Sequence, residues 1–152
     1  MNSTAMADET AWPGGSAGQG LLDTNIIILR GRIDPAELPD EMAISAITLA
    51  ELSAGPHQVR DNDHRERARR LDVLQRAEHE FDPIPFDVQT ARIHGRLAAA
   101  VVAVGRTPRR RVADLMIASI AVAEGLALFT TNPSDFVGLD ELLTVVPVTR
   151  PS

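Results

Sequence analysis

The chain has 152 residues, which is typical of one domain whose core is large enough to fold without disulfides or a structural metal. It contains no cysteine, so disulfides, thiolate nucleophiles, zinc–thiolate sites and iron–sulfur clusters are excluded. All 15 basic residues are arginine, which excludes Schiff-base and P-loop lysines, and the net charge of −6 argues in bulk against a nucleic-acid partner.

The first 19 residues are small, polar and rich in glycine and serine, which predicts a flexible N-terminal tail followed by one domain over residues 20–149. They hold no basic residue and no apolar run, so they do not resemble a secretory signal. The longest strongly apolar stretch, 97–104, is too short to span a bilayer. We therefore expect a soluble cytoplasmic protein that has no membrane partner.

The first half of the domain alternates short apolar runs with helical patterns. A buried strand is predicted over 20–23, a short helix over 24–29 and a second strand over 42–46. A helix over 47–54 ends at a Gly-Pro pair, and a charged helix over 62–80 follows. Glutamate or aspartate four residues before arginine predicts i,i+4 ion pairs on this charged helix, Glu66 with Arg70 and Asp72 with Arg76.

The second half continues the alternation. Two prolines make 81–85 extended, and helices are predicted over 87–104 and 112–124, each followed by glycine. Short strands follow over 126–130 and 143–146. The helix predicted over 87–104 has an apolar stripe that is assigned to the core, and the stripe consists of Ile93, Leu97, Val101 and Val104. Strands joined by helical crossovers predict an α/β fold of three layers, with a short parallel sheet between helices.

Acidic side chains fall at the carboxyl ends of the predicted strands, where open parallel sheets bind their ligands. Asp23 ends the first strand, Glu51 lies in the helix after the second, and Asp114 lies near the start of the helix over 112–124. Asn132 and Asp135 follow the strand over 126–130. The first three acids have apolar neighbours, and acids that converge on one cleft repel each other unless a hard divalent cation such as Mg²⁺ or Mn²⁺ neutralises them.

Each of these acids also has a purely structural interpretation when it is taken singly. Asp23 is a suitable helix N-cap, and Asp114 favours the positive end of a helix dipole. Glu51 could be an ordinary exposed helix residue. The order of the acids and their apolar flanks favour a shared site over three independent structural roles.

Four segments carry a family resemblance: Leu-Leu-Asp-Thr-Asn at 21–25, Ala-Glu-Leu at 50–52, Asp-Leu-Met-Ile-Ala at 114–118 and Thr-Thr-Asn-Pro-Ser-Asp-Phe at 130–136. In this order and spacing they resemble the PIN domain, and more narrowly the VapC toxin ribonucleases of type II toxin–antitoxin modules. The resemblance covers residues 20–149. It implies a Mg²⁺-dependent endoribonuclease that leaves a 3′-hydroxyl, forms a homodimer and binds a VapB-type antitoxin in its active-site groove.

The resemblance also implies roles for individual residues. Asp23 and Asp114 would ligate the metal directly, and Glu51 would hold metal-bound water or a second ion. The family varies at its fourth acidic position, and here Asp135 is the better candidate because Asn132 is neutral. Hydrogen bonds to ligands, phosphate or substrate are assigned to Thr24, Asn25, Thr130 and Asn132, and Thr130 has the alternative interpretation of an ordinary strand residue.

The arginines give two further interpretations. Arg109, Arg110 and Arg111 precede the helix that carries Asp114, where they form either a solvated loop or contacts to the RNA backbone. The arginines between 60 and 76 are interpreted as surface charge on a helix. Residues 60–111 hold 12 arginines and 8 acids, a local charge of +4, so the bulk charge is a poor guide to the partner.

Other function classes fit less well. A phosphoacceptor receiver domain needs a lysine at a late strand, and a haloacid-dehalogenase phosphatase needs an Asp-x-Asp pattern where this chain has Asp23-Thr24-Asn25. The four histidines share no metal-ligand spacing. The alternative that remains is a non-catalytic PIN-like module that binds RNA or protein.

Overall fold

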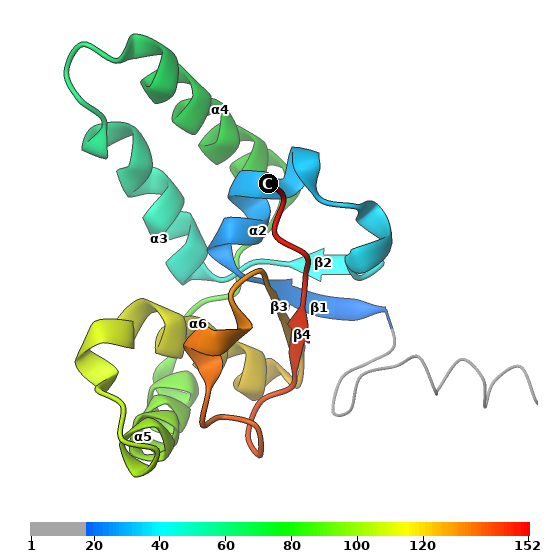
Figure 1. The fold of residues 1–152 in the computed structure, drawn as a ribbon, viewed down its shortest axis with the longest axis vertical. Helices are drawn as coiled ribbons and strands as arrows, with labels where there is room; N and C mark the ends of the chain where they lie inside the picture. Colours follow the sequence, from blue (N-terminus) through cyan, green and yellow to red (C-terminus); the bar gives the residue numbers. More distant parts are fainter. Residues whose placement is uncertain (1–17) are drawn as a thin grey trace, which may run out of the picture.

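The computed structural model describes residues 18–152, in which a sheet of four parallel strands lies between two groups of helices (Figure 1). The sheet has the order β2-β1-β3-β4, and the strands are β1 (Gln19–Leu22), β2 (Glu41–Ala43), β3 (Ala127–Thr130) and β4 (Val145–Pro147). Short 3₁₀ turns connect the longer helices, which are α2 (Thr24–Leu29), α3 (Ala46–Ala54), α4 (His64–Glu80), α5 (Val88–Ala103) and α6 (Val112–Glu124).

The two central strands divide the core into two halves because their side chains alternate between the faces of the sheet. Leu21 of β1 and Leu128 of β3 pack with the apolar residues of α5 and α6. Leu22 and Phe129, their neighbours along the strands, pack with α2, α3 and α4. The predicted three-layer α/β/α fold is therefore confirmed, and burial on both faces explains why both strands are mostly apolar.

Gly20 of β1 is required by packing between the two central strands. The ring of Phe129 lies over it, and a Cβ atom at this position would come within 2.3 Å of a ring carbon. Since aromatic rings in a packed core cannot move far, any larger residue would displace β3. Glycine at this position of β1 therefore lets Phe129 pack against the strand.

Two helices have the predicted bounds. α2 spans 24–29 and α6 spans 112–124, as the sequence predicts. α6 ends at Gly125, whose φ of 67° lies in the left-handed region that favours glycine. The predicted ion pairs of α4 also form, with Glu66 Oε2 at 2.7 Å from Arg70 Nε and Asp72 Oδ2 at 3.0 Å from Arg76 Nε.

The predicted strand over 42–46 is too long. β2 ends at Ala43, and the chain then enters α3 because Ser45 is an N-cap whose Oγ accepts a hydrogen bond from Thr48 N at 3.0 Å. The extended stretch over 81–85 adds no full strand, but Ile84 forms a parallel bridge with Ser45. The sheet is thus extended by a single bridge immediately before α3.

The predicted core stripe of α5 is wrong at its last position. Ile93, Leu97 and Val101 are buried as expected, but Val104 is 50 % exposed. The reason is that α5 ends at Ala103, so Val104 no longer follows the helical period that places the other three against α6.

The N-terminal tail predicted over 1–19 lies outside the described residues, except for Gly18 and Gln19, and Gln19 is already part of β1. Within residues 18–152, every helix is too short or too polar to cross a lipid bilayer.

The sheet order creates the position of the site. β1 pairs with β2 on one side and with β3 on the other. The chain leaves β1 toward β2 and leaves β3 toward β4, so the two connections diverge at the carboxyl ends of these neighbouring strands. Asp23 follows β1 and its backbone N–H donates to Phe129 O at 2.9 Å, which fixes it beside the end of β3. A crevice at these carboxyl ends is expected from the topology alone.

Candidate active site

A cleft of about 260 Å³ lies at the carboxyl ends of β1 and β3, where α2, α3, α4 and α6 meet. Four acidic side chains from separate segments line it, and they are Asp23, Glu51, Asp114 and Asp135. The structure thus brings together all four acids that the sequence nominates. Asn132 does not line this cleft.

Asp23 is the most buried of the acids, at 5 % exposure. It is the N-cap of α2, so Oδ1 accepts from Thr24 N at 2.9 Å, and Oδ2 accepts from Thr130 Oγ1 at 2.8 Å. Burial raises the pKa of Asp23, and the charges of Glu51 and Asp135 raise it further, while the two hydrogen bonds act in the opposite direction. The structural interpretation of Asp23 as an N-cap is therefore true, and the same carboxylate also lines the cleft.

Asp114 lies in the first turn of α6 and is partly buried. Burial raises its pKa to about 6, and the nearby charges of Asp23, Asp135 and Glu51 add to the effect, whereas Arg111 opposes it. A carboxylate whose ionisation is disfavoured by three other carboxylates marks a concentration of negative charge. Such perturbed acids in a cleft are characteristic of functional sites.

Glu51 is exposed, contrary to what its apolar neighbours suggest, but its orientation is fixed by hydroxyl groups. Thr24 Oγ1 donates to Glu51 Oε1 at 2.6 Å and lies 2.9 Å from Thr48 Oγ1. Ser45 Oγ extends the chain, at 3.4 Å from Thr48 Oγ1. Because Ser45 and Thr48 are fully buried, this chain of hydroxyl groups links the exposed glutamate to the buried side of α3.

Asp135 lies in the turn Pro133–Phe136 and pairs with Arg111, whose Nη1 is 2.6 Å from Asp135 Oδ1. Asn132 is used elsewhere, because its Oδ1 accepts from Arg150 Nη1 at 3.2 Å and its backbone N–H donates to Thr130 Oγ1 at 3.0 Å. The fourth acid at this cleft is therefore Asp135, partly balanced by an arginine.

The other nominated contact residues separate into two groups. Thr24 and Asn25 line the cleft. Thr130 does not, because it is fully buried and its hydroxyl is bonded to Asp23, so it positions an acid and cannot touch a substrate.

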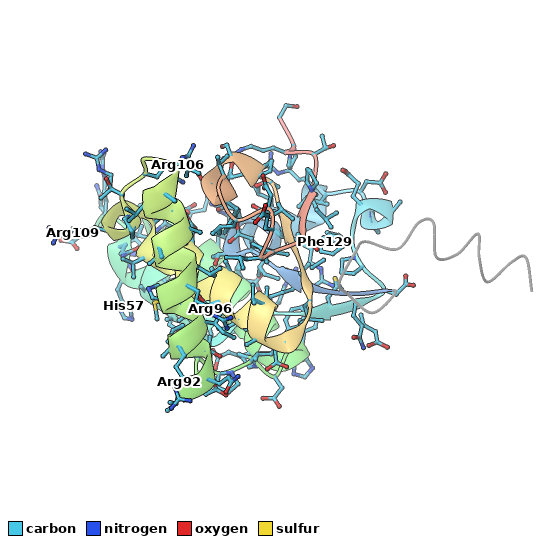
Figure 2. All side chains as sticks on the ribbon, turned by 90° about the horizontal axis from the view of Figure 1, so that it is seen from below. His57, Arg92, Arg96, Arg106, Arg109 and Phe129 are labelled. Carbon is cyan, nitrogen blue, oxygen red and sulfur yellow. The ribbon has the colours of Figure 1, made fainter. Side chains whose placement is uncertain are left out.

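The arginine triplet before α6 is also split. Arg111 reaches the acids through Asp135, whereas Arg109 and Arg110 are exposed and lie outside the cleft lining. Figure 2 shows Arg109 at the outer edge of the molecule, near the end of α5. None of the three arginines lines the cleft, and only Arg111 contacts one of its acids, so contact of the triplet with the RNA backbone stays a prediction.

Sequence reasoning missed three residues. Thr48 lies one helical turn before Glu51, and this i,i+3 spacing after a capping serine could have revealed it. Arg69 and Arg70, interpreted from the sequence as surface charge, line the cleft from the side of α4. No pattern in the charged helix distinguishes them from its other arginines.

Comparisons with known proteins identify the family of this fold. The sequence matches the PIN domain family over residues 20–142. The chain belongs to the PIN-domain family. It is 36 % identical over 129 residues to Ribonuclease VapC5 of Mycobacterium tuberculosis (strain ATCC 25618 / H37Rv), across 83 % of this chain and 91 % of that protein. Ribonuclease VapC8 of the same strain is 36 % identical over 110 residues, across 70 % of this chain and 94 % of VapC8.

A solved structure shows the same relation for this PIN domain. The crystal structure of VapBC-5 from Mycobacterium tuberculosis, a member of the VapBC family of toxin-antitoxin systems, superimposes with a TM-score of 0.72 and 34 % sequence identity. The superposition covers 84 % of this chain and 95 % of that chain. The resemblance drawn from the four sequence segments is therefore confirmed, and the chain is a PIN domain of VapC type.

The PIN-domain cleft fits a magnesium ion by its chemistry. Its acids offer only hard oxygen donors, and their mutual repulsion is the charge excess that a divalent cation relieves. No group of three or more His, Cys, Asp or Glu side chains within residues 18–152 is arranged to hold a metal by itself. Magnesium does not need one, because it commonly keeps several waters and uses only one or two carboxylates, and Asp23 and Asp114 are suitable for that role.

The raised pKa of Asp114 predicts that the metal-free PIN domain loses stability as the pH rises from about 4 to 6. The folded state binds the Asp114 proton more tightly than the unfolded state, so this contribution is fully present below the ordinary pKa of 3.8 and is lost through the folded pKa of about 6. The unfolding free energy of Asp114→Asn minus that of the wild type should therefore increase by about 2 kcal/mol from pH 4 to pH 7, measured by urea unfolding in EDTA. Parallel pH profiles for the two proteins would contradict the assignment.

Proposed function

We propose that this protein is a Mg²⁺-dependent endoribonuclease, the toxin of a VapBC-type toxin–antitoxin module. The observation that carries the proposal is the convergence of Asp23, Glu51, Asp114 and Asp135 on one cleft at the switch point of the sheet. The names of the relatives VapC5 and VapC8 support the ribonuclease activity.

In this mechanism Asp23 and Asp114 would hold the magnesium ion. The ion, when bound, lowers the pKa of a water molecule and offsets charge on the phosphate oxygens (Mn²⁺ could supply the same chemistry). Asp23 is rigid because Thr24 and Thr130 hold both of its oxygens. The site is thus organised before substrate arrives, which is what electrostatic catalysis requires.

Glu51 orients the attacking water. Thr24 donates to Oε1, so Oε2 remains available to accept a hydrogen bond from water at the phosphate. Attack of that water on phosphorus forms a new P–O bond and breaks the bond to the 3′-oxygen, so the products are a 5′-phosphate and a 3′-hydroxyl. The proton that the water loses passes to solvent, and solvent supplies the proton that the 3′-oxygen takes up. Arg111 limits the negative charge at this end of the cleft by pairing with Asp135.

The positioning role of Thr48 can be tested separately. In Thr48→Val, Thr24 loses the partner that fixes its hydroxyl, so Glu51 is held less firmly. Hydrogen-bond partners that orient the residues of a metal site typically contribute 10–100-fold to activity, and Thr48 acts on Glu51 only through Thr24, so we expect kcat for RNA cleavage to fall about 10-fold. Thr48→Ser keeps the hydroxyl and is expected to restore most of the rate. Equal rates for the valine variant and the wild type would refute the role.

Two partners are also part of the proposal. A VapB-type antitoxin is supported by the solved structure of VapBC-5, a member of the VapBC family of toxin-antitoxin systems, one chain of which this chain matches over most of its length. A homodimer is supported by apolar side chains left exposed around the end of α5, where Val102, Val104 and Val112 are 59 %, 50 % and 47 % exposed.

The alternative function, a non-catalytic PIN-like module that binds RNA or protein, is weaker because all four acids are present in the cleft. Incubation of the purified protein with total cellular RNA, with MgCl₂ or with EDTA, distinguishes the two functions. We expect fragmentation only with magnesium. Intact RNA that is nevertheless retained by the protein would favour the binding module.

A further inference from the structure

The α4 side of the acidic cleft carries two arginines that the mechanism above does not use. Arg69 and Arg70 line the same cleft as the four acids, although they come from a helix of the opposite layer to α6. Ile28, Leu52 and Val73 add apolar side chains to the lining, and Gly55 and Gln58 also line the cleft. The cleft therefore presents four acidic and two basic side chains together with apolar ones.

Glu66 holds the two arginines side by side. Its Oε1 accepts from Arg69 Nε at 2.9 Å, and its Oε2 accepts from Arg69 Nη2 at 2.8 Å and from Arg70 Nε at 2.7 Å. These bonds lower the pKa of Glu66 to about 2, so the carboxylate stays ionised at any physiological pH. One carboxylate against two guanidinium groups leaves a net charge of +1.

The bonds to Glu66 leave some hydrogen-bond donors of the two arginines free. Arg70 Nη1 donates to Gly55 O at 3.1 Å, which ties the α4 helix to the end of α3. Arg69 Nη1 and Arg70 Nη2 have no partner among residues 18–152, and the two side chains are 62 % and 40 % exposed. Two fixed guanidinium groups with outward donors match the oxygens of a phosphate group.

We propose that Arg69 and Arg70, held by Glu66, form a second phosphate subsite that binds the RNA backbone away from the scissile phosphate. This inference rests on the ribonuclease function proposed above. RNA carries a phosphate at every nucleotide, so a strand whose reacting phosphate lies at Asp23 and Asp114 presents another along the same cleft. The apolar side chains in the same lining suit a nucleobase, whose faces are apolar.

The test measures RNA affinity in the silenced Asp114→Asn protein, so that the probe stays intact. The probe is a fluorescein-labelled single-stranded RNA of about 20 nucleotides, and its Kd is measured against NaCl concentration. We expect Arg69→Gln with Arg70→Gln to weaken binding about 10-fold at low salt. The slope of log affinity against log salt should fall by about 0.7 for each phosphate that the arginines no longer neutralise.

Arg76→Gln is the matched control. Arg76 lies on the same helix and has a carboxylate partner at i−4, as Arg70 does, but it does not line this cleft. We expect its Kd and salt slope to equal those of the parent. A loss of affinity as large in Arg76→Gln as in the double variant would overturn the subsite, because helix charge in general would then explain the binding.

Kinetics separates the subsite from the catalytic function. With Asp114 intact, the double variant should raise KM for RNA about 10-fold and leave kcat nearly unchanged, because the arginines bind a non-reacting phosphate. Unaltered RNA affinity together with weakened binding of a poly-glutamate peptide would overturn the subsite in favour of an acidic protein segment. If the wild type cuts no RNA while the arginine variants still lose affinity, the nuclease proposal fails, and the two arginines remain only as an RNA-binding site.

Discussion

Asp114→Asn is expected to abolish RNA cleavage while the fold stays intact. The amide keeps the size of the side chain but removes the charge that would ligate magnesium at the start of α6. Because a bound metal ion contributes several kcal/mol to the stabilisation of the transition state, the cleavage rate should fall by about 10³-fold or more. The measurement is the initial rate on a labelled RNA at saturating MgCl₂, with circular dichroism as the check on folding.

The same variant separates catalysis from stability. Asp114 is partly buried beside three other acids, and its pKa is raised to about 6, so its neutral replacement should fold at least as stably as the wild type at pH 7. A structural acid would behave in the opposite way, because its replacement would destabilise the fold. Undiminished cleavage by a well-folded Asp114→Asn protein would remove the residue from the active site.

Metal removal is the second change with a large expected effect. EDTA should silence the wild-type enzyme, and MgCl₂ in excess should restore the rate. The same titration should raise Tm, because a ligand that binds only the folded state adds about 2.7 kcal/mol at 100 times its Kd. This rise in Tm is a readout that does not depend on RNA.

The matched control for the metal is the pair Asp23→Asn and Glu51→Gln. Asp23 is buried and is assigned as a direct ligand, so its variant should lose most of the magnesium-dependent rise in Tm. Glu51 is exposed and acts on water, so its variant should keep the rise and lose activity. An identical Tm response in the two variants would contradict the division of roles.

Much of the fold could be predicted from the sequence because its signals are local. Apolar runs at 20–23 and 126–130 have almost no polar interruption, which is typical of a strand covered on both faces. Gly125 marks the end of α6 for the same local reason. The errors, at Val104 and at the end of β2, arise where a helix ends or an N-cap begins within a few residues of the predicted boundary.

The acids could be predicted because parallel strands place their carboxyl ends at one edge, whatever the helices do. Their environments could not. Apolar neighbours in the sequence suggest burial for Glu51, but on a helix adjacent residues point in different directions, and Glu51 is exposed.

The charged helix shows a second limit. Arg69 and Arg70 line the cleft and Arg76 does not. This difference depends on how α4 packs against the rest of the fold, which is a tertiary property. The charge pattern of α4 therefore predicts its ion pairs correctly and does not indicate which arginines meet the acids.

The most direct test is to map RNA ends in cells after induction of the wild-type protein beside Asp114→Asn. The metal-dependent mechanism predicts a discrete set of new ends, with 3′-hydroxyl termini, that appears with the wild type and is absent with the variant. The same set of ends in both samples, with the two proteins at equal abundance, would contradict the claim that the acidic cleft cuts RNA.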